Sequence, residues 1–342
     1  MTSLARSAYK DLWNIGIETG KLNLLTEKVG ELLRQDFPPE VWIVDQLIPD
    51  NGVTILSGAP GSFKTWLYME IAVKVASGQP AFGHFTTKQT SVLVVDEESG
   101  RRRLQSRFRQ MGANEDSPIH ILSRTGYKLQ QLYVDAIVEK AHAVGAGLVI
   151  FDSFTRFTGD NADENSSGDM AKLMDAYRQL ADEGLSVLIL HHHRKNANDP
   201  SKSLRGSGDI LAAIDCHITA IRNGQSEEVA LRQTKNRDVW EAKPIKLRFH
   251  ENASEFEFAG FDKTAIAVHK ENLDKLIETV VAHPGLTQTK LKKQAQISGV
   301  VGGEKKIVDY INFLVEKNEI EERPTDRNGK TYYPITSAAK TQ

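Results

Sequence analysis

The chain alternates short apolar runs with longer amphipathic segments between Trp42 and Phe258. Apolar runs bounded by turn residues predict strands buried on both faces, whereas apolar residues at a helical period predict helices. Strands are predicted over 53–56, 90–96, 119–122, 147–152 and 185–190, and helices over 65–77, 99–112 (capped by Ser99), 130–144 and 169–182. This alternation predicts an α/β fold with a mostly parallel central sheet and helices on its faces.

The pattern changes after residue 208. Residues 213–221, 228–234 and 245–249 are predicted to be successive strands, with turns at Asn223-Gly224 and near Lys243-Pro244. Two polar stretches, 155–168 and 196–208, predict loops at one edge of the sheet.

An outlying segment precedes the alternating region. Residues 1–37 carry apolar residues at roughly helical spacing, interrupted near Gly20, and Pro38-Pro39 ends the pattern. The apolar face is expected to cover the core of the same subunit, with a neighbouring subunit as the alternative. The sequence therefore predicts a helical segment over 1–38 and a central domain over 39–261.

Residues 262–342 are predicted to form a separate unit. Helices are expected over 270–282, 286–295 (opened by Thr287) and 304–318, followed by a hairpin over 320–323 and 331–334 with a turn at 327–329. Three helices and a hairpin predict a winged helix, whose third helix can enter a DNA major groove. Residues 288–342 contain 10 Lys or Arg and 7 Asp or Glu, a net of only +3. Because carboxylates also lie on the third helix, protein docking is the alternative to DNA binding.

Composition narrows the class of protein. The 342 residues are 40% hydrophobic and 26% charged, which is typical of a globular protein of about two domains. A formal net charge of −2 gives no chain-wide basic field, so nucleic acid could bind only at local patches. The single cysteine, Cys216, excludes a disulfide framework and a cysteine-based zinc site, and is expected to be a small buried strand residue. With no apolar run near the roughly 20 residues that cross a membrane, and no signal-peptide core, we expect a cytoplasmic protein without membrane contact.

The segment VTILSGAPGSFKTWLY, residues 53–68, has the outline of a phosphate-binding P-loop. A strand leads through glycines to Lys64 and Thr65 at a helix start, where backbone N–H groups, the lysine and the helix end can hold phosphate, and the hydroxyl can hold Mg²⁺. The pattern requires glycine before Lys64, and this chain has Phe63. A chance glycine-rich turn is the alternative. The residues expected to bind nucleotide are Gly58, Ala59, Pro60, Gly61, Ser62, Phe63, Lys64, Thr65 and Trp66.

Acidic residues end two of the other predicted strands. The run GLVIFD ends at Asp152 in a Walker B pattern, which places a carboxylate beside the P-loop where it can hold the water shell of Mg²⁺. Strand 90–96 ends in Asp96-Glu97-Glu98.

Two clusters of basic residues follow later strands. His191, His192 and His193 come directly after an apolar strand, and adjacent residues of an extended chain cannot all face one zinc ion. A phosphate-sensing role for one histidine is therefore preferred to metal binding. Lys235 and Arg237 lie near another strand end, either in a solvated turn or delivered to the γ-phosphate in a neighbouring subunit as an arginine finger.

These motifs together resemble the RepA-like, RecA-fold ATPases, a family carried by plasmids, phages and mobile elements and related to the hexameric replicative helicases. The resemblance covers Val41 to Phe258 and rests on the order of GAPGSFKT, VVDEE, RRRLQSRFRQMG, GLVIFDS, LILHHHRK, LRGSG and KNR. It implies ATP and Mg²⁺ at the P-loop, with Mg²⁺ held by Thr65 and Asp152.

The resemblance also implies catalytic roles. Glu98, which fits the family's acidic position better than Glu97, would orient the attacking water. His191 or His192 would sense the γ-phosphate and report it to the loop that ends at residues 205–208. Lys235 and Arg237 would reach the adjacent subunit's site, which requires a ring or filament.

Two classes of function follow. The first is an ATP-hydrolysing hexameric ring acting on single-stranded DNA, a replicative helicase or DNA-processing motor whose loops 155–168 and 196–208 grip the phosphate backbone. The second is an ATP-dependent adaptor or regulator that assembles on DNA or a partner protein without unwinding. The acidic residues Asp160, Asp163 and Glu164 of the first loop disfavour the helicase.

Overall fold

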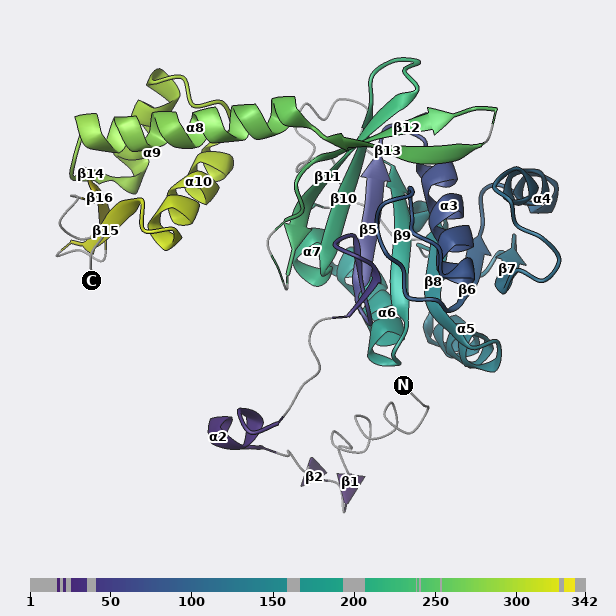
Figure 1. The fold of residues 1–342 in the computed structure, drawn as a ribbon. Helices are drawn as coiled ribbons and strands as arrows, with labels where there is room; N and C mark the ends of the chain where they lie inside the picture. Colours follow the sequence, from purple (N-terminus) through teal and green to yellow (C-terminus); the bar gives the residue numbers. More distant parts are fainter. Residues whose placement is uncertain are drawn as a thin grey trace. The chain divides into compact units, whose positions relative to one another are not determined.

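The computed structural model of the protein describes residues 17–18, 21–22, 26–35, 41–158, 167–192, 207–237, 239, 241–252, 254–325 and 329–335. The chain divides into two compact units, Met1–Gly260 and Phe261–Gln342. Figure 1 shows the elements of both units.

A nine-stranded sheet forms the centre of the first unit, in the order β13-β12-β11-β10-β5-β9-β8-β6-β7. The strands are β5 (Val53–Gly58), β6 (Ser91–Asp96), β7 (Ile119–Ser123), β8 (Ala146–Asp152), β9 (Ser186–His192), β10 (Cys216–Arg222), β11 (Glu228–Asn236), β12 (Ile245–His250) and β13 (Glu255–Phe261). From β10 to β7 the neighbouring strands are parallel, whereas β10, β11 and β12 pair antiparallel. This confirms the α/β fold with a mostly parallel central sheet.

Helices cover both faces of the sheet (Figure 1). On one face lie α3 (Lys64–Ser77) and α4 (Arg101–Gln110), and on the other lie α5 (Gln131–Ala143), α6 (Ser167–Asp182) and α7 (Ser207–Ala213). Alternate residues of β6 enter opposite cores: Val92 and Val94 pack with α3 and α4, and Leu93 and Val95 pack with α5 and α6. Because every second side chain of a strand points to the same face, the continuous apolar run fills both cores.

The structure differs from the sequence prediction at several elements. Strands β3 (Trp42–Val44), β4 (Ile48–Pro49) and β13 were not predicted; β3 and β4 are short, and alternating Glu and Phe mark β13 as half-exposed. The predicted cap of α4 at Ser99 is wrong. The N-cap is Gly100, and the buried Asp96 carboxylate accepts the backbone N–H groups of Ser99 and Gly100.

The predicted helix over residues 1–37 is wrong at residues 17–18 and 21–22, which form two paired strands. β1 (Ile17–Glu18) pairs antiparallel with β2 (Lys21–Leu22), while α2 (Val29–Leu32) is helical; the other residues of this prediction lie outside the described part, apart from 26–28 and 33–35. Gly20, between the two strands in sequence, costs a helix about 1 kcal/mol relative to alanine. Opposite charges on Glu18 and Lys21, which are register partners, favour the pairing instead.

The second unit combines three helices with a small antiparallel sheet of order β14-β16-β15. Its elements are α8 (Lys263–Ala282), β14 (Leu286–Thr287), α9 (Gln288–Ile297), α10 (Glu304–Glu316), β15 (Ile320–Pro324) and β16 (Lys330–Pro334). Its separate core includes Leu276, Leu291, Ile307, Ile311 and Tyr332. α8 begins seven residues before its predicted start at 270.

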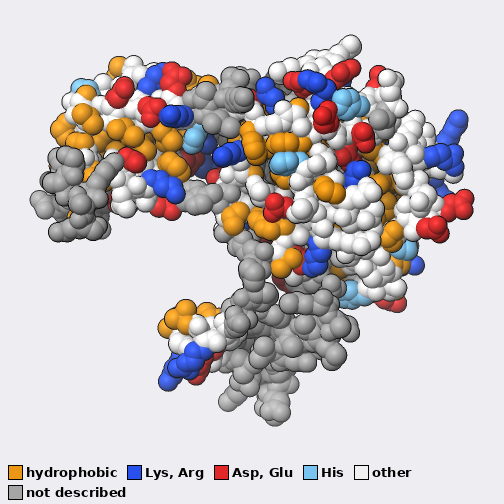
Figure 2. All heavy atoms as spheres, viewed as in Figure 1, with side chains coloured by type: hydrophobic (Ala, Val, Ile, Leu, Met, Phe, Trp, Pro, Cys, Tyr) orange, Lys and Arg blue, Asp and Glu red, His pale blue; other side chains and the backbone are white. Residues whose placement is uncertain are grey.

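Surface charge is mixed on the described residues that face the viewer in Figure 2. On the face shown in Figure 2, Lys and Arg side chains lie among Asp and Glu side chains, and no broad area carries one sign of charge. None of the helices in the described ranges is long and apolar enough to cross a lipid bilayer. Cys216 is buried in β10, as its sequence context predicted.

Candidate functional site

The predicted P-loop connects the carboxyl end of β5 to the start of α3. Lys64 folds back over the loop, and its Nζ donates to the carbonyl oxygens of Gly58 (2.9 Å) and Ala59 (3.0 Å). Gly58 packs closely against Ser62 and Ala220. A Cβ at this position would lie 2.4 Å from Ser62 Oγ and 2.7 Å from the Ala220 carbonyl oxygen. Residues 59–61 are exposed, Ser62 is buried, and Thr65 is half-buried in the first turn of α3. The Lys64 amino group is therefore held against the loop backbone by two of its carbonyl oxygens.

Phe63 takes a backbone conformation that usually requires glycine. Its φ is +66° and its ψ is 10°, in the left-handed region, directly before Lys64. A side chain there costs about 1–2 kcal/mol. The ring packs against Phe249 (5.0 Å between centroids) and Phe256 (5.8 Å), and the Arg222 guanidinium lies 3.8 Å from its centroid. Packing of the Phe63 ring therefore stabilises this left-handed backbone conformation.

We expect Phe63→Ala to be less stable than Phe63→Gly by about 1 kcal/mol, although both remove the ring and its packing. Alanine keeps a Cβ in the left-handed conformation and glycine does not. Denaturant titration of the two variants measures the difference. At Phe258, inside strand β13, the same pair should rank in the opposite order because glycine weakens a strand. Equal stability of the two variants at residue 63 would show that a side chain in this left-handed conformation carries no strain.

Trp66, in the first turn of α3, joins the same aromatic group. Its ring lies 5.4 Å from Phe249, and Arg107 of α4 lies 5.3 Å from its centroid. Trp66, which was predicted to bind nucleotide, therefore packs its ring between Phe249 and Arg107 beside the loop.

Asp152 ends β8 in register with Asp96 at the end of β6. It is only 3% exposed, and among the described residues its Oδ2 atom has no hydrogen-bond partner. Burial, together with the negative charges of Glu98 and Asp96, raises its pKa to about 7 despite the opposing charge of Lys64. A buried carboxylate oxygen without a partner, close to a phosphate-binding loop, fits the hard oxygen ligand that Mg²⁺ prefers.

Glu97 and Glu98 have different surroundings. Glu97 accepts hydrogen bonds from Thr125 N (2.7 Å), Thr125 Oγ1 (2.6 Å) and Gly126 N (3.1 Å), so it holds the turn after β7. Glu98 points toward β9, where its Oε2 lies 3.5 Å from His192 Nε2. The hydrogen bond with His192 lowers the pKa of Glu98 to about 2; burial opposes this effect, and a hydrogen bond with Ser153 adds to it. Unlike Glu97, Glu98 does not use its carboxylate to hold a turn.

Lys64 is electrostatically connected to these acids. Burial lowers its pKa to about 8, while the charges of Asp152 and then Glu98 act to raise it. The structure therefore brings Lys64, Asp152 and Glu98 together at the carboxyl edge of the sheet, although they are up to 88 residues apart in sequence.

His191 and His192 occupy the end of β9 beside the P-loop strand, in register with Ser57 and Gly58. His191 is buried against Phe154, with 4.8 Å between ring centroids. His192 is half-buried and is the one that contacts Glu98. His193 and the loop residues up to 206 lie outside the described part of the chain, as do residues 159–166.

Lys235 and Arg237 lie at the opposite edge of the sheet. Arg237 donates to the Ala212 carbonyl oxygen (2.8 Å) and pairs with Asp215 (3.1 Å), while Lys235 donates to the Leu211 carbonyl oxygen. Asp215 also accepts the N–H of Val53, the first residue of β5 (2.8 Å). Since β5 has six residues at about 3.3 Å each, this end is roughly 20 Å from the P-loop. One chain does not bring Lys235 and Arg237 to its own loop.

Sequence reasoning missed the aromatic and arginine contacts of the loop. Arg222, Phe249 and Phe256 come from strands more than 150 residues after Phe63, and no motif marks them. The one available signal was Phe63 itself, because a bulky residue in a glycine position needs packing partners. No group of three or more His, Cys, Asp or Glu able to hold a metal occurs among the described residues.

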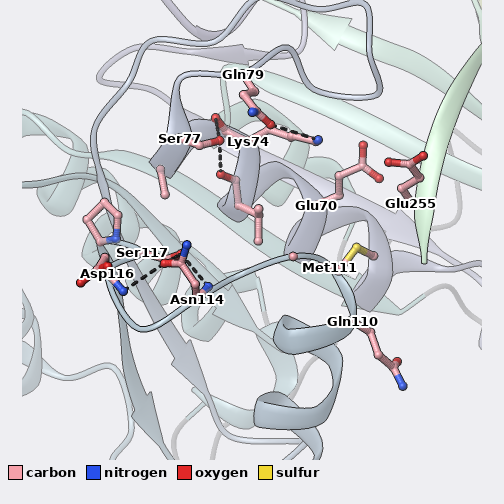
Figure 3. A pocket seen from close by; sticks show the side chains of 14 residues that line it. Glu70, Lys74, Ser77, Gln79, Gln110, Met111, Asn114, Asp116, Ser117 and Glu255 are labelled. Atoms are coloured by element: carbon pink, nitrogen blue, oxygen red, sulfur yellow. Dashed lines mark hydrogen bonds between the residues drawn. The ribbon is translucent and has the colours of Figure 1, made fainter. Parts of the chain in front are cut away.

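A cavity of about 530 Å³ lies at the carboxyl-terminal half of α3, away from the P-loop (Figure 3). Glu70, Lys74 and Glu255 are among its lining residues. Glu70 accepts the backbone N–H groups of Phe82 (3.1 Å) and Phe256 (2.6 Å), and burial raises its pKa to about 7. This carboxylate holds α3 to the Phe82 turn and β13.

The sequence matches a known protein family over the part of the chain that forms this site. A family model described as an AAA domain (AAA_25) matches residues 19–198, which include Lys64, Glu98, Asp152 and His192 but end before β10. The chain therefore carries a P-loop ATPase domain with an α/β fold. It belongs to this AAA domain family. No curated protein matches the sequence significantly.

Solved structures with a similar fold share 16% sequence identity with the chain. One of them, a separately solved ATPase domain, has a TM-score of 0.48, covering 61% of this chain and 84% of that chain. A DnaB-like replicative helicase, solved for its interactions with primase, has a TM-score of 0.49 over 60% of this chain and 57% of that chain. The RadB recombinase has a TM-score of 0.46 over 62% and 92%.

Proposed function

We propose that this protein hydrolyses ATP at the P-loop with Mg²⁺. The observation that carries the proposal is the convergence of Lys64, Asp152 and Glu98 at the carboxyl ends of the parallel strands β5, β8 and β6. Lys64 would exchange the carbonyl oxygens of Gly58 and Ala59 for phosphate oxygens. Thr65 and Asp152 would hold Mg²⁺, which supplies charge neutralisation at the phosphates.

Glu98 is the proposed base that orients the attacking water. Its low pKa comes first from its hydrogen bond with His192. When His192 turns to a γ-phosphate, it no longer bonds to Glu98 and the carboxylate becomes more basic, so recognition of the triphosphate would activate the base. His191, buried against Phe154, would position its neighbour.

Lys235 and Arg237 are proposed to act on the site of an adjacent subunit, in a hexameric ring. Their place at the far edge of their own sheet, roughly 20 Å from their own loop, supports action between subunits. Each site would then consist of one subunit's P-loop and its neighbour's two cations.

The second unit is proposed to be a winged helix. Its elements follow the order helix, short strand, two helices and hairpin, and α10 is the helix that would contact duplex DNA. Single-stranded DNA would pass the ring, as in a replicative helicase or DNA-processing motor of a mobile element.

A regulator or adaptor that does not unwind DNA is the second candidate, and one observation favours it. Four cations of this unit are paired with acids: Lys275 with Glu271, Lys292 with Glu304, Arg323 with Glu321, and Lys330 with Glu322. Such pairing reduces the positive charge that DNA would meet. ATPase rates with and without single-stranded DNA, measured beside native mass with ATP, separate the two: stimulation of a ring supports the motor, and an unaffected rate supports the regulator.

Magnesium binding should weaken as the pH falls below 7. Asp152 has a raised pKa of about 7, so below that pH it is neutral and Mg²⁺ must displace a proton, which costs about tenfold in affinity per pH unit. Calorimetry of Mg²⁺–nucleotide binding at pH 6, 7 and 8 measures this dependence. The same titration of Asp152→Asn measures the pH dependence that comes from protonation of the nucleotide itself, which is then subtracted. A wild-type profile parallel to that of the variant would contradict the assignment.

DNA binding by the second unit should depend on Lys290, Lys293 and Lys305. These three are exposed, and among the described residues none of them forms an ion pair. Replacing all three by alanine should lower the slope of log affinity against log salt by about 3, near 0.9 for each phosphate that is no longer neutralised. The control replaces the paired Lys292, Arg323 and Lys330, which should change the slope less. An unchanged slope in the first variant would assign the unit to protein docking.

A further inference from the structure

The P-loop of this chain lacks the glycine that normally precedes the lysine, and Arg222 contacts the loop at that point. Arg222 is the last residue of β10, the strand that pairs with the P-loop strand β5. Its guanidinium lies 3.8 Å from the Phe63 ring centroid, and its Nη1 donates to the Gly61 carbonyl oxygen (3.1 Å). One side chain therefore holds two positions of the loop.

Arg222 is itself fixed. Its Nε donates to the Ser226 carbonyl oxygen (2.6 Å) in the turn between β10 and β11. Among the described residues no carboxylate pairs with it, so its charge faces a ring and two carbonyl oxygens. A planar guanidinium can stack and donate in its plane at the same time, which lysine cannot do.

The hydrogen bond to Gly61 fixes the orientation of a peptide group. In a trans peptide the carbonyl and the following N–H point in opposite directions. With the Gly61 oxygen directed at Arg222, the Ser62 N–H is directed into the loop, where it donates to the Ala59 carbonyl oxygen (3.2 Å). Inward N–H groups are what a P-loop offers to phosphate.

We propose that Arg222 is a positioning residue that keeps the P-loop in its triphosphate-binding conformation, through the Phe63 ring and the Gly61 carbonyl. The proposal rests on the proposed ATP site. A loop that is competent only part of the time binds with an affinity reduced by that fraction. Phe63 holds its strained backbone because its ring is packed, and Arg222 covers one side of that ring.

The test compares Mg²⁺–ATP with Mg²⁺–tripolyphosphate, which has no nucleobase, as ligands of the full chain. Arg222→Ala should weaken both about tenfold, because the phosphate cradle is affected. The KM for ATP should rise by a similar factor while kcat changes less than about twofold, since bound phosphate itself holds the loop. Arg222→Lys should retain part of the affinity through one hydrogen bond. The control is Arg248→Ala, which removes an arginine from the nearby strand β12 and its pair with Glu228, and should leave both affinities unchanged.

A double-mutant cycle tests the path through Phe63. In the Phe63→Gly background, Arg222→Ala should cost about threefold or less, because the substitution then removes only the hydrogen bond to Gly61. The same tenfold loss in both backgrounds would overturn the proposal. A loss confined to ATP and absent with tripolyphosphate would also overturn it, since Arg222 would then contact the nucleobase.

Lys64→Ala separates this proposal from the function on which it rests. If wild-type protein binds ATP, Lys64→Ala does not, and Arg222→Ala binds as tightly as wild type, then the positioning role is wrong and the ATP site stands. If wild-type protein binds neither ligand, both are wrong.

Discussion

Lys64→Ala should reduce ATP hydrolysis by at least about 100-fold, the cost of removing one group that stabilises charge in a transition state. The lysine is buried, bonded to the carbonyl oxygens of Gly58 and Ala59, and has a pKa lowered to about 8. A triphosphate offers more negative charge than two carbonyl groups, so binding should draw Lys64 toward the ligand and keep it protonated. Steady-state ATPase assays and nucleotide titration measure the loss of rate and of affinity.

Lys74→Ala is the matched control for this prediction. Lys74 lies on the same helix α3, ten residues later, where its Nζ contacts Gln79 at 3.4 Å. Its removal should leave the rate within about twofold of wild type. If Lys64→Ala hydrolyses ATP as fast as this control, the P-loop is not the catalytic site.

The sequence was sufficient to predict the elements that local pattern determines. Strands β5, β6, β8 and β9 are continuous apolar runs, and each was predicted to within two residues. A strand that is buried on both faces is apolar at nearly every position, so its sequence is easy to identify as a strand. The outermost strand, β13, was harder to predict, because it begins Glu-Phe-Glu-Phe and lies half in solvent.

The position of the candidate site followed from the same pattern, because carboxyl ends of parallel strands meet at one edge. That rule predicted Asp152 beside the P-loop from the sequence, whereas the choice of Glu98 rested on the family resemblance. It could not choose between Glu97 and Glu98 on physical grounds, since their difference arises from Thr125 and Gly126 on another strand's turn. Nor could it find Arg222, whose contact with Phe63 depends on the pairing of β10 with β5. Such contacts are set by three-dimensional packing, which one sequence does not encode locally.

Arg237→Ala should reduce the rate of turnover about 10³-fold or more and leave nucleotide binding unchanged, if this arginine acts on the neighbour's γ-phosphate. The substitution should be tolerated by the fold. Asp215 keeps two other partners, the Arg178 guanidinium (2.8 Å) and the Val53 N–H (2.8 Å), so no buried carboxylate is left without partners. Size measurement with ATP checks assembly, and ATPase assays check the rate.

Mixing two inactive variants tests whether the site is shared between subunits. Arg237→Ala keeps Glu98, and Glu98→Gln keeps Arg237, so an equal mixture restores sites where the two meet in the right order, about a quarter of all sites in a randomly mixed closed ring. Lys64→Ala mixed with Glu98→Gln is the control. Both residues belong to one subunit's half of the site, so no mixed interface contains both, and activity should stay absent. Recovery in the first mixture alone shows that Arg237 acts between subunits, whereas no recovery in either would make the site self-contained.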